Sequence, residues 1–154
     1  MFQKVKNLFY FPIAGYFRFF AGIRLALWGP RVVVVTGSSG KTTLLHLIES
    51  QLGASARYSF KANSSFGIPF DILDIHRTDL TFREWPKIFL LAPFALLKKF
   101  PEEKIFIVEA DCDRPYEGKF LSKLLNPEVT LWLNVSRTHS MNFEKVYRSR
   151  TFDS

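Results

Sequence analysis

The chain has few cysteines and few acids near its start. Of its 154 residues only Cys112 is a cysteine, which excludes an internal disulfide framework and a zinc site built from several cysteines. A single cysteine also suits the reducing cytoplasm, where we expect the protein to be located. No acidic residue precedes Glu49. With 47% hydrophobic and 23% charged residues, the composition is that of a globular protein rather than a disordered one.

Residues 1–30 form a basic, aromatic-rich arm that lacks an uninterrupted apolar run. Most of the net charge of +7 comes from the first fifth of the chain. Arg18 and Arg24 interrupt the roughly 20 apolar residues that a membrane span needs. Three interpretations stay open: a helix packed on the domain that follows, a helix lying on the inner surface of a membrane, and a spanning helix. Because the charge lies in an apolar segment, we expect no nucleic-acid partner.

Strand and helix patterns alternate after a boundary near Gly29 and Pro30. Aliphatic, β-branched runs at 31–36 and 105–110 predict buried strands of a parallel sheet, and residues 129–135 predict a third strand. Helical spacing predicts helices over 41–52, 67–73, 85–100 and 116–125, with a possible kink at Pro93, and a short strand near 56–60. The prediction is therefore an α/β fold, a three-layer, mostly parallel sheet of P-loop type formed by residues 31–154 as one domain.

A turn of small residues follows the first predicted strand and opens the next helix. It reads Thr36-Gly37-Ser38-Ser39-Gly40-Lys41-Thr42-Thr43. Backbone N–H groups of such a turn and of the helix N-terminus face an anion, so the pattern predicts a cradle for the phosphates of ATP. Lys41 is expected to reach the β- and γ-phosphates, and the Thr42 hydroxyl to bind Mg²⁺. The common P-loop has a further glycine where this chain has Val35, so the match is partial.

Further polar residues follow the other strands, at the edge where parallel sheets bind ligands. Glu109 ends the second strand, where its carboxylate is placed to hold Mg²⁺, and Asp111 and Asp113 compete for that role. His139 follows the third strand, and Asn63 lies in a turn-forming segment. Taken alone, each has a simpler interpretation: a solvated acidic loop, a surface histidine and an Asx turn.

Four segments, in this order, resemble the central ATPase domain of the Mur ligases. Residues 35–43 look like the family's T-G-[ST]-[NS]-G-K-[TS]-[TS] loop, which also lacks the earlier glycine. Residues 63–73 are similar to the N-x-x-[IF]-G-[VI]-P-x-x-[IL]-L segment of the member that adds D-alanyl-D-alanine. Residues 107–110 look like the family's strand ending in glutamate, and Gly118 and residues 126–129 resemble its G-x-[IF] and P-x-V segments. Residues 133–139 resemble T-N-[IV]-x-x-x-H.

The resemblance implies an ATP-dependent ligase that joins a carboxylate to an amine through an acyl phosphate in cell-wall precursor synthesis. It implies catalytic roles for Lys41, Glu109 and His139 and places Asn63 near the γ-phosphate. Thr42 and Glu109 would bind the first Mg²⁺, and His139 would help to hold a second metal ion. The loop residues 36–43 would bind ATP, while the carboxylate and amine substrates are not identified.

The resemblance also implies that this chain corresponds to only part of a longer ligase. Family members carry a nucleotide-sugar domain before the loop and an amine-binding domain after the ATPase domain, whereas about 35 basic and apolar residues precede the loop here. We therefore expect residues 31–154 to be the N-terminal part of the ATP-binding domain, and we expect the chain by itself not to form an amide bond. A membrane-peripheral P-loop NTPase or kinase anchored by residues 1–30 is the alternative.

Overall fold

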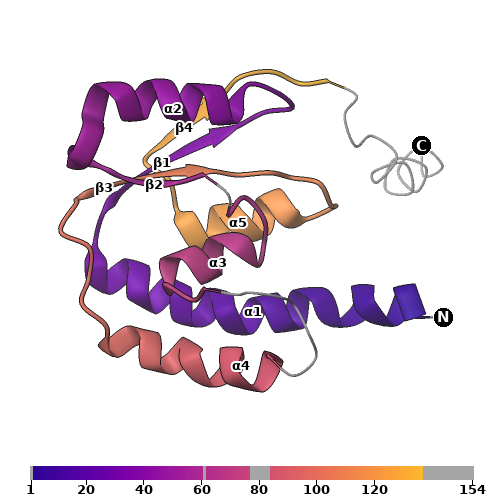
Figure 1. Cartoon of the computed structure of the whole chain (residues 1–154). Coiled ribbons are helices and arrows are strands. Elements are labelled where there is room, and N and C mark those ends of the chain that lie inside the picture. The colour runs from indigo at the N-terminus through magenta and orange to yellow at the C-terminus, as the bar shows by residue number, and fades with distance from the viewer. Residues whose placement is uncertain (1, 61, 77–83, 137–154) are drawn as a thin grey trace.

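Four strands form one parallel sheet in the computed structural model, which describes residues 2–60, 62–76 and 84–136, without the side chains of residues 2–9 (Figure 1). They lie in the order β2-β3-β1-β4. Their bounds are β1 Arg31–Thr36, β2 Arg57–Ser59, β3 Ile105–Glu109 and β4 Val129–Trp132. All three pairings between neighbours are parallel. The central strand β1 pairs with β3 on one side and with β4 on the other.

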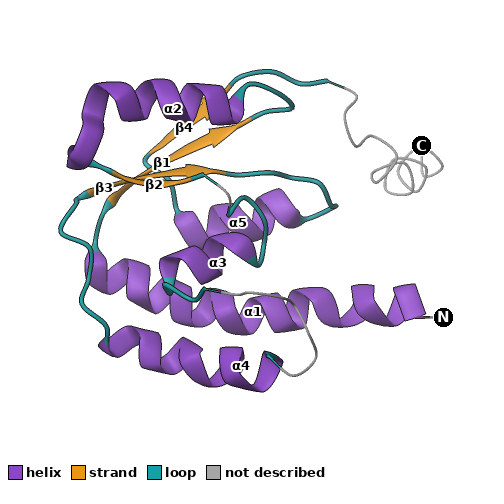
Figure 2. Ribbon diagram, viewed as in Figure 1, coloured by secondary structure: helices purple, strands orange, loops and turns teal. Residues whose placement is uncertain are grey.

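Helices cover both faces of this sheet (Figure 2). On one face lies α2 (Lys41–Leu52), and the other side holds α1 (Phe2–Trp28), α3 (Gly67–Ile72) and α5 (Glu117–Leu125). Helix α4 (Trp85–Phe94) packs on α1, farther from the sheet. Two short 3₁₀ helices, η1 (Gly53–Ser55) and η2 (Ala95–Leu97), continue α2 and α4. The predicted three-layer α/β architecture with a parallel sheet is confirmed.

The β-branched run of β1 explains its central place in the sheet. Successive side chains of a strand point to opposite faces. Val32 and Val34 join the larger hydrophobic core, on the side of α1, whereas Val35 joins a smaller core with Leu45 of α2 and Ile107 of β3. A strand that is buried on both faces needs apolar residues at every position, and this is what the sequence pattern predicts.

The elements end slightly earlier than the sequence predicts. The helix expected over 85–100 is α4 followed by η2, because Pro93 has no N–H to donate within the last turn. The strands expected to reach residues 110 and 135 end at Glu109 and Trp132. The ladder nevertheless continues for one bond, since Ala110 N–H donates to the carbonyl of Val35.

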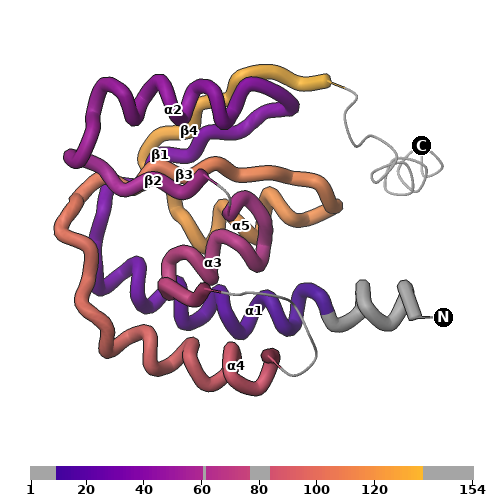
Figure 3. The backbone as a smooth tube through the Cα atoms, in the orientation of Figure 1, coloured from indigo at the N-terminus to yellow at the C-terminus, as the bar shows by residue number. Residues whose placement is uncertain are grey.

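The basic arm is a helix that packs on the domain. In α1 the residues Ala14, Phe17, Ala21, Leu25 and Trp28 recur at helical spacing and are buried in the same core as the valines of β1. The tube in Figure 3 shows α1 running under the sheet before the chain turns into β1. The packed-helix interpretation is thus confirmed, while the domain boundary at residue 30 stays a prediction. In the described part of the chain, no helix has the length and apolar character to cross a membrane.

Arg24 lies on the buried side of α1, and its guanidinium group donates hydrogen bonds to backbone carbonyls of other helices. Its Nε donates to the carbonyl of Ile72 at 2.9 Å, its Nη1 to those of Ala95 and Lys98, and its Nη2 to that of Lys99 at 3.0 Å. Burial lowers the pKa of Arg24. The acceptors lie at the end of α3 and along and after η2, near helix C-termini where a cation is favoured. The carbonyl of Ala95 also accepts from Lys98 N–H. Arg24 therefore fastens three helices together.

Candidate functional site

The turn between β1 and α2 lies at the C-terminal edge of the sheet (Figure 1). Gly37 and Gly40 have φ values of 137° and 84°, in the region that favours glycine. A Cβ atom on Gly37 would lie 3.1 Å from the backbone N and O of Asn134, so glycine is required there on both grounds. Helix α2 begins at Lys41, and no side chain caps its N-terminus. The first N–H groups of α2 are therefore left to other acceptors.

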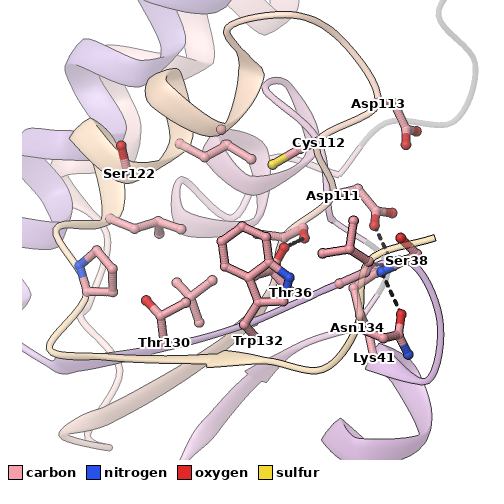
Figure 4. A pocket seen from close by; sticks show the side chains of 18 residues that line it. Thr36, Ser38, Lys41, Asp111, Cys112, Asp113, Ser122, Thr130, Trp132 and Asn134 are labelled. Atoms are coloured by element: carbon pink, nitrogen blue, oxygen red, sulfur yellow. Dashed lines mark hydrogen bonds and ion pairs between the residues drawn. The ribbon is translucent and has the colours of Figure 1, made fainter. Parts of the chain in front are cut away.

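The Lys41 side chain curls back over the turn (Figure 4). Its Nζ donates to the carbonyl of Gly37 at 2.6 Å and forms an ion pair with Asp111 Oδ1 at 2.8 Å. The side chain of Lys41 is only 10% exposed and that of Asp111 22% exposed, so solvent screens this pair less than an open surface pair. The positive charge thus sits directly over the loop predicted to hold phosphate.

Thr42 and Glu109 meet at the start of α2 and the end of β3. The hydroxyl of Thr42 donates to Glu109 Oε2 at 2.8 Å, and Glu109 is buried. Among the described residues no group of three or more His, Cys, Asp or Glu side chains could hold a metal ion. Mg²⁺, however, commonly takes one or two protein oxygens and completes its shell with phosphate oxygens and water. The hydroxyl and the carboxylate fit that requirement.

Asp111 connects Asn63 to Lys41. The side-chain amide of Asn63 donates to Asp111 Oδ2, and the N–H of Asp111 donates to the carbonyl of Asn63 at 2.8 Å. Asp113 lies farther from the loop (Figure 4). The three carboxylates that the sequence left in competition therefore have different surroundings: Glu109 faces Thr42, and Asp111 faces the lysine.

Asn134 is a loop residue to which the sequence pattern assigned no role. Its Oδ1 accepts hydrogen bonds from the N–H groups of Ser38 and Ser39 at 3.1 and 3.0 Å, and its Nδ2 donates to the carbonyl of Ser39 at 3.1 Å. Its backbone carbonyl also accepts from Ser38 N–H. The available signal was its place just after a strand that neighbours β1, because such residues meet at one edge of a parallel sheet.

Removal of the Asn134 side chain should loosen the turn. In Asn134→Ala, the amide hydrogen of Ser39 is expected to exchange roughly 10-fold faster, about 1.4 kcal/mol, the scale of one lost hydrogen bond. The amide hydrogen of Ser38 should change less, because it keeps its bond to the backbone carbonyl of residue 134. Asn134→Asp is the matched control, because its carboxylate still accepts both bonds and should keep most of the protection. Exchange measured by mass spectrometry or NMR checks this, and equal rates in Asn134→Ala and the unmodified chain would show that the side chain does not hold the turn.

A cavity of about 480 Å³ adjoins the turn, between β1, β4 and α5 (Figure 4). Lys41 and Asp111 line its polar end, and Leu121 and Trp132 line its apolar part. Cys112 also faces it. Cys112 is exposed at the mouth of this cavity, yet partial desolvation, followed by the charge of Glu117, raises the pKa of its thiol. The thiol therefore stays protonated and poorly nucleophilic at neutral pH.

Most of the predicted site residues lie together, at the C-terminal ends of β1 and β3. Thr36 belongs to the same edge, where its hydroxyl donates to the carbonyl of Ala110 at 3.0 Å. Glu109 contacts Thr42 of the loop, and Asn63 is connected to Lys41 of the loop through Asp111. His139, predicted to bind a second metal ion, lies outside the described residues.

The fold and the turn define a parallel α/β domain whose polar residues gather at the C-terminal edge of its sheet. Residues 35–148, most of the chain, match the Mur ligase middle domain. The chain belongs to the Mur ligase family. This membership points to an ATP-dependent acid–amino acid ligase of peptidoglycan-related synthesis, in a family that normally uses Mg²⁺. No solved structure matches the chain.

Proposed function

We propose that the turn binds Mg²⁺–ATP and that the γ-phosphoryl group is transferred to a substrate carboxylate. The carboxylate oxygen attacks the γ-phosphorus, the bond to the β–γ bridging oxygen breaks, and ADP leaves. An amine nitrogen then attacks the carbonyl carbon of the acyl phosphate, the carbon–oxygen bond breaks and phosphate leaves, while the amine loses a proton to water. The observation that carries this proposal is the convergence of Lys41, Thr42 and Glu109 on the uncapped N-terminus of α2.

Each of these residues has a role that follows from its position. Lys41 Nζ lies over the loop and exchanges its contact with Asp111 for phosphate oxygens, neutralising part of their charge. The loop N–H groups and the start of α2 orient the phosphates. The oxygens of Thr42 and Glu109 hold Mg²⁺, which supplies charge stabilisation for phosphoryl transfer.

The remaining assignments extend this proposal. Asn63 is proposed to lie near the γ-phosphate, which its bond to Asp111 beside Lys41 supports. His139 is proposed to help to hold a second metal ion. Residues 31–154 are proposed to form the N-terminal part of the ATP-binding domain. A P-loop NTPase or kinase would share the loop chemistry, but the family match over residues 35–148 favours a ligase.

Lys41→Ala tests the phosphate site. We expect the affinity for Mg²⁺–ATP to fall at least ~10-fold, about 1.4 kcal/mol, because a charge-assisted contact to phosphate is lost. Isothermal titration measures the affinity, and Lys87→Ala, an exposed lysine of α4, is the matched control that should bind normally. An unchanged dissociation constant in folded Lys41→Ala would contradict the phosphate cradle.

The acyl-phosphate step has a separate test. With Mg²⁺–ATP and a panel of carboxylates from peptidoglycan precursors, hydroxylamine should trap an acyl phosphate as a hydroxamate. The hydroxamate should depend on both the carboxylate and Lys41. ATP binding combined with carboxylate-independent phosphate release would favour the NTPase alternative instead.

A further inference from the structure

The outward sides of α1 and α4 are apolar. The exposed side chains of α1 between residues 10 and 28 are Pro12, Phe19, Ala26 and Leu27. On α4 and η2 the large exposed apolar side chains recur at helical spacing, as Leu90, Phe94 and Leu97. We call Phe19, Leu27, Leu90, Phe94 and Leu97 the outer helical face; each of the five is at least 61% exposed. Single exposed leucines are ordinary, but five large exposed apolar side chains on two adjacent helices are a candidate interaction surface.

The two helices that carry this face are neighbours. The rings of Tyr16 in α1 and Phe89 in α4 lie 5.0 Å apart, and the Tyr16 hydroxyl donates to the carbonyl of Phe89 at 2.9 Å. Both helices lie on the side of the domain away from α2, whereas the phosphate loop lies at the C-terminal edge of the sheet (Figure 2). A partner that covers the outer helical face therefore leaves the loop open.

The charged side chains on α1, α4 and η2 are all basic. The sequences of α1, α4 and η2 contain no acidic residue. Arg18 and Lys123 line a groove beside Phe19, and Lys87 is exposed on α4. The next lysines along the chain, Lys98 and Lys99, are paired with Asp74 and Glu102 and contribute less. Apolar side chains flanked by basic groups are complementary to a lipid bilayer, which has an apolar interior and anionic headgroups at its surface.

We propose that the outer helical face docks the protein on an anionic lipid bilayer. The helices lie along the surface, with the phenylalanines and leucines in the boundary between headgroups and acyl chains and the basic groups beside anionic headgroups. The described helices do not cross the bilayer. A second copy of the chain fits less well, because pairing the face with itself brings basic groups against basic groups.

Vesicle pelleting tests this proposal. The complete chain is mixed with phosphatidylcholine vesicles with or without phosphatidylglycerol. We expect binding to the anionic vesicles and a decrease with added salt. The double variant Leu90→Ser, Phe94→Ser should bind at least ~10-fold more weakly, because two large apolar side chains no longer enter the bilayer boundary. Leu47→Ser, a 60% exposed leucine of α2 on the opposite face of the sheet, is the matched control and should bind like the unmodified chain.

Three outcomes of these experiments would contradict membrane docking. It is wrong if the unmodified chain stays in the supernatant with anionic vesicles, or if Leu47→Ser loses as much binding as the double variant. It is also wrong if sedimentation shows a dimer that the double variant abolishes and vesicles do not bind, since a second copy then covers the face. Thermal melts monitor folding, which substitutions at these exposed positions should leave nearly unchanged.

Discussion

Phe17→Ala is expected to lower the free energy of unfolding by about 3–5 kcal/mol. Phe17 is completely buried in the middle of α1. Its ring centroid lies 4.7 Å from that of Phe70 in α3 and 5.1 Å from that of Phe89 in α4, so it joins the arm to two other helices. Alanine would leave a cavity among rigid aromatic rings that cannot easily collapse to fill it.

Phe19→Ala provides the control within the same helix. Its side chain is 63% exposed, so its replacement should change the free energy of unfolding by no more than about 0.5 kcal/mol. Urea unfolding followed by circular dichroism compares the two variants. If the two alanine variants lose the same free energy of unfolding, α1 does not pack on the domain in the way described.

Arg24→Met should destabilise the chain by about 1–3 kcal/mol. Methionine fills much of the same volume but donates no hydrogen bond, so the buried carbonyl of Ile72 at the end of α3 loses its donor. The carbonyl of Ala95 keeps a bond from Lys98 N–H, and those of Lys98 and Lys99 belong to exposed residues. Each buried acceptor left without a donor costs roughly 1–3 kcal/mol. Arg24→Lys should recover only part of the loss, because one ammonium group cannot reproduce the planar, forked geometry of the guanidinium group.

Arg18→Met is the control that distinguishes the loss of the Arg24 hydrogen bonds from the loss of any positive charge on α1. Arg18 lies over the ring of Phe120, 4.7 Å from its centroid, and is only partly buried. We expect a loss of about 0.5–1 kcal/mol for a partly exposed cation–π contact. Equal losses for Arg18→Met and Arg24→Met in urea unfolding would mean that the four carbonyl bonds do not carry the stability assigned to them.

Local patterns were enough to predict the sheet and the shape of the loop. The runs of β1 and β3 are short, apolar at almost every position and end in a polar residue, which fits a strand buried on both faces. The third run includes Thr130, and its strand β4 is mostly exposed. Because parallel strands end at one edge, the sequence pattern predicts Glu109 near Thr42, and in the structure their oxygens lie 2.8 Å apart. These features depend on neighbours in sequence and on one general rule of topology.

Contacts between distant segments could not be predicted in the same way. Hydropathy alone presents Arg24 as an interruption of an apolar helix, but its partners are carbonyls 48 to 75 positions later in the chain. Asn134 bonds to a loop almost 100 positions earlier. Which carboxylate faces Lys41 depends on where Asp111 turns after β3. No periodicity in the sequence encodes such pairings, because they arise only when the helices and strands are assembled.

The position of β1 in the sheet has a consequence for synthesis. This strand is made before its partners, because β3 and β4 begin more than 70 positions after Arg31. At about 5–20 residues per second, the valines of β1 stay unpaired on the ribosome for roughly 4–14 s, beside an apolar helix that is also uncovered. The nascent chain therefore presents two adjacent aggregation-prone segments at once, and we expect its yield on expression to depend on chaperones that bind extended apolar peptides.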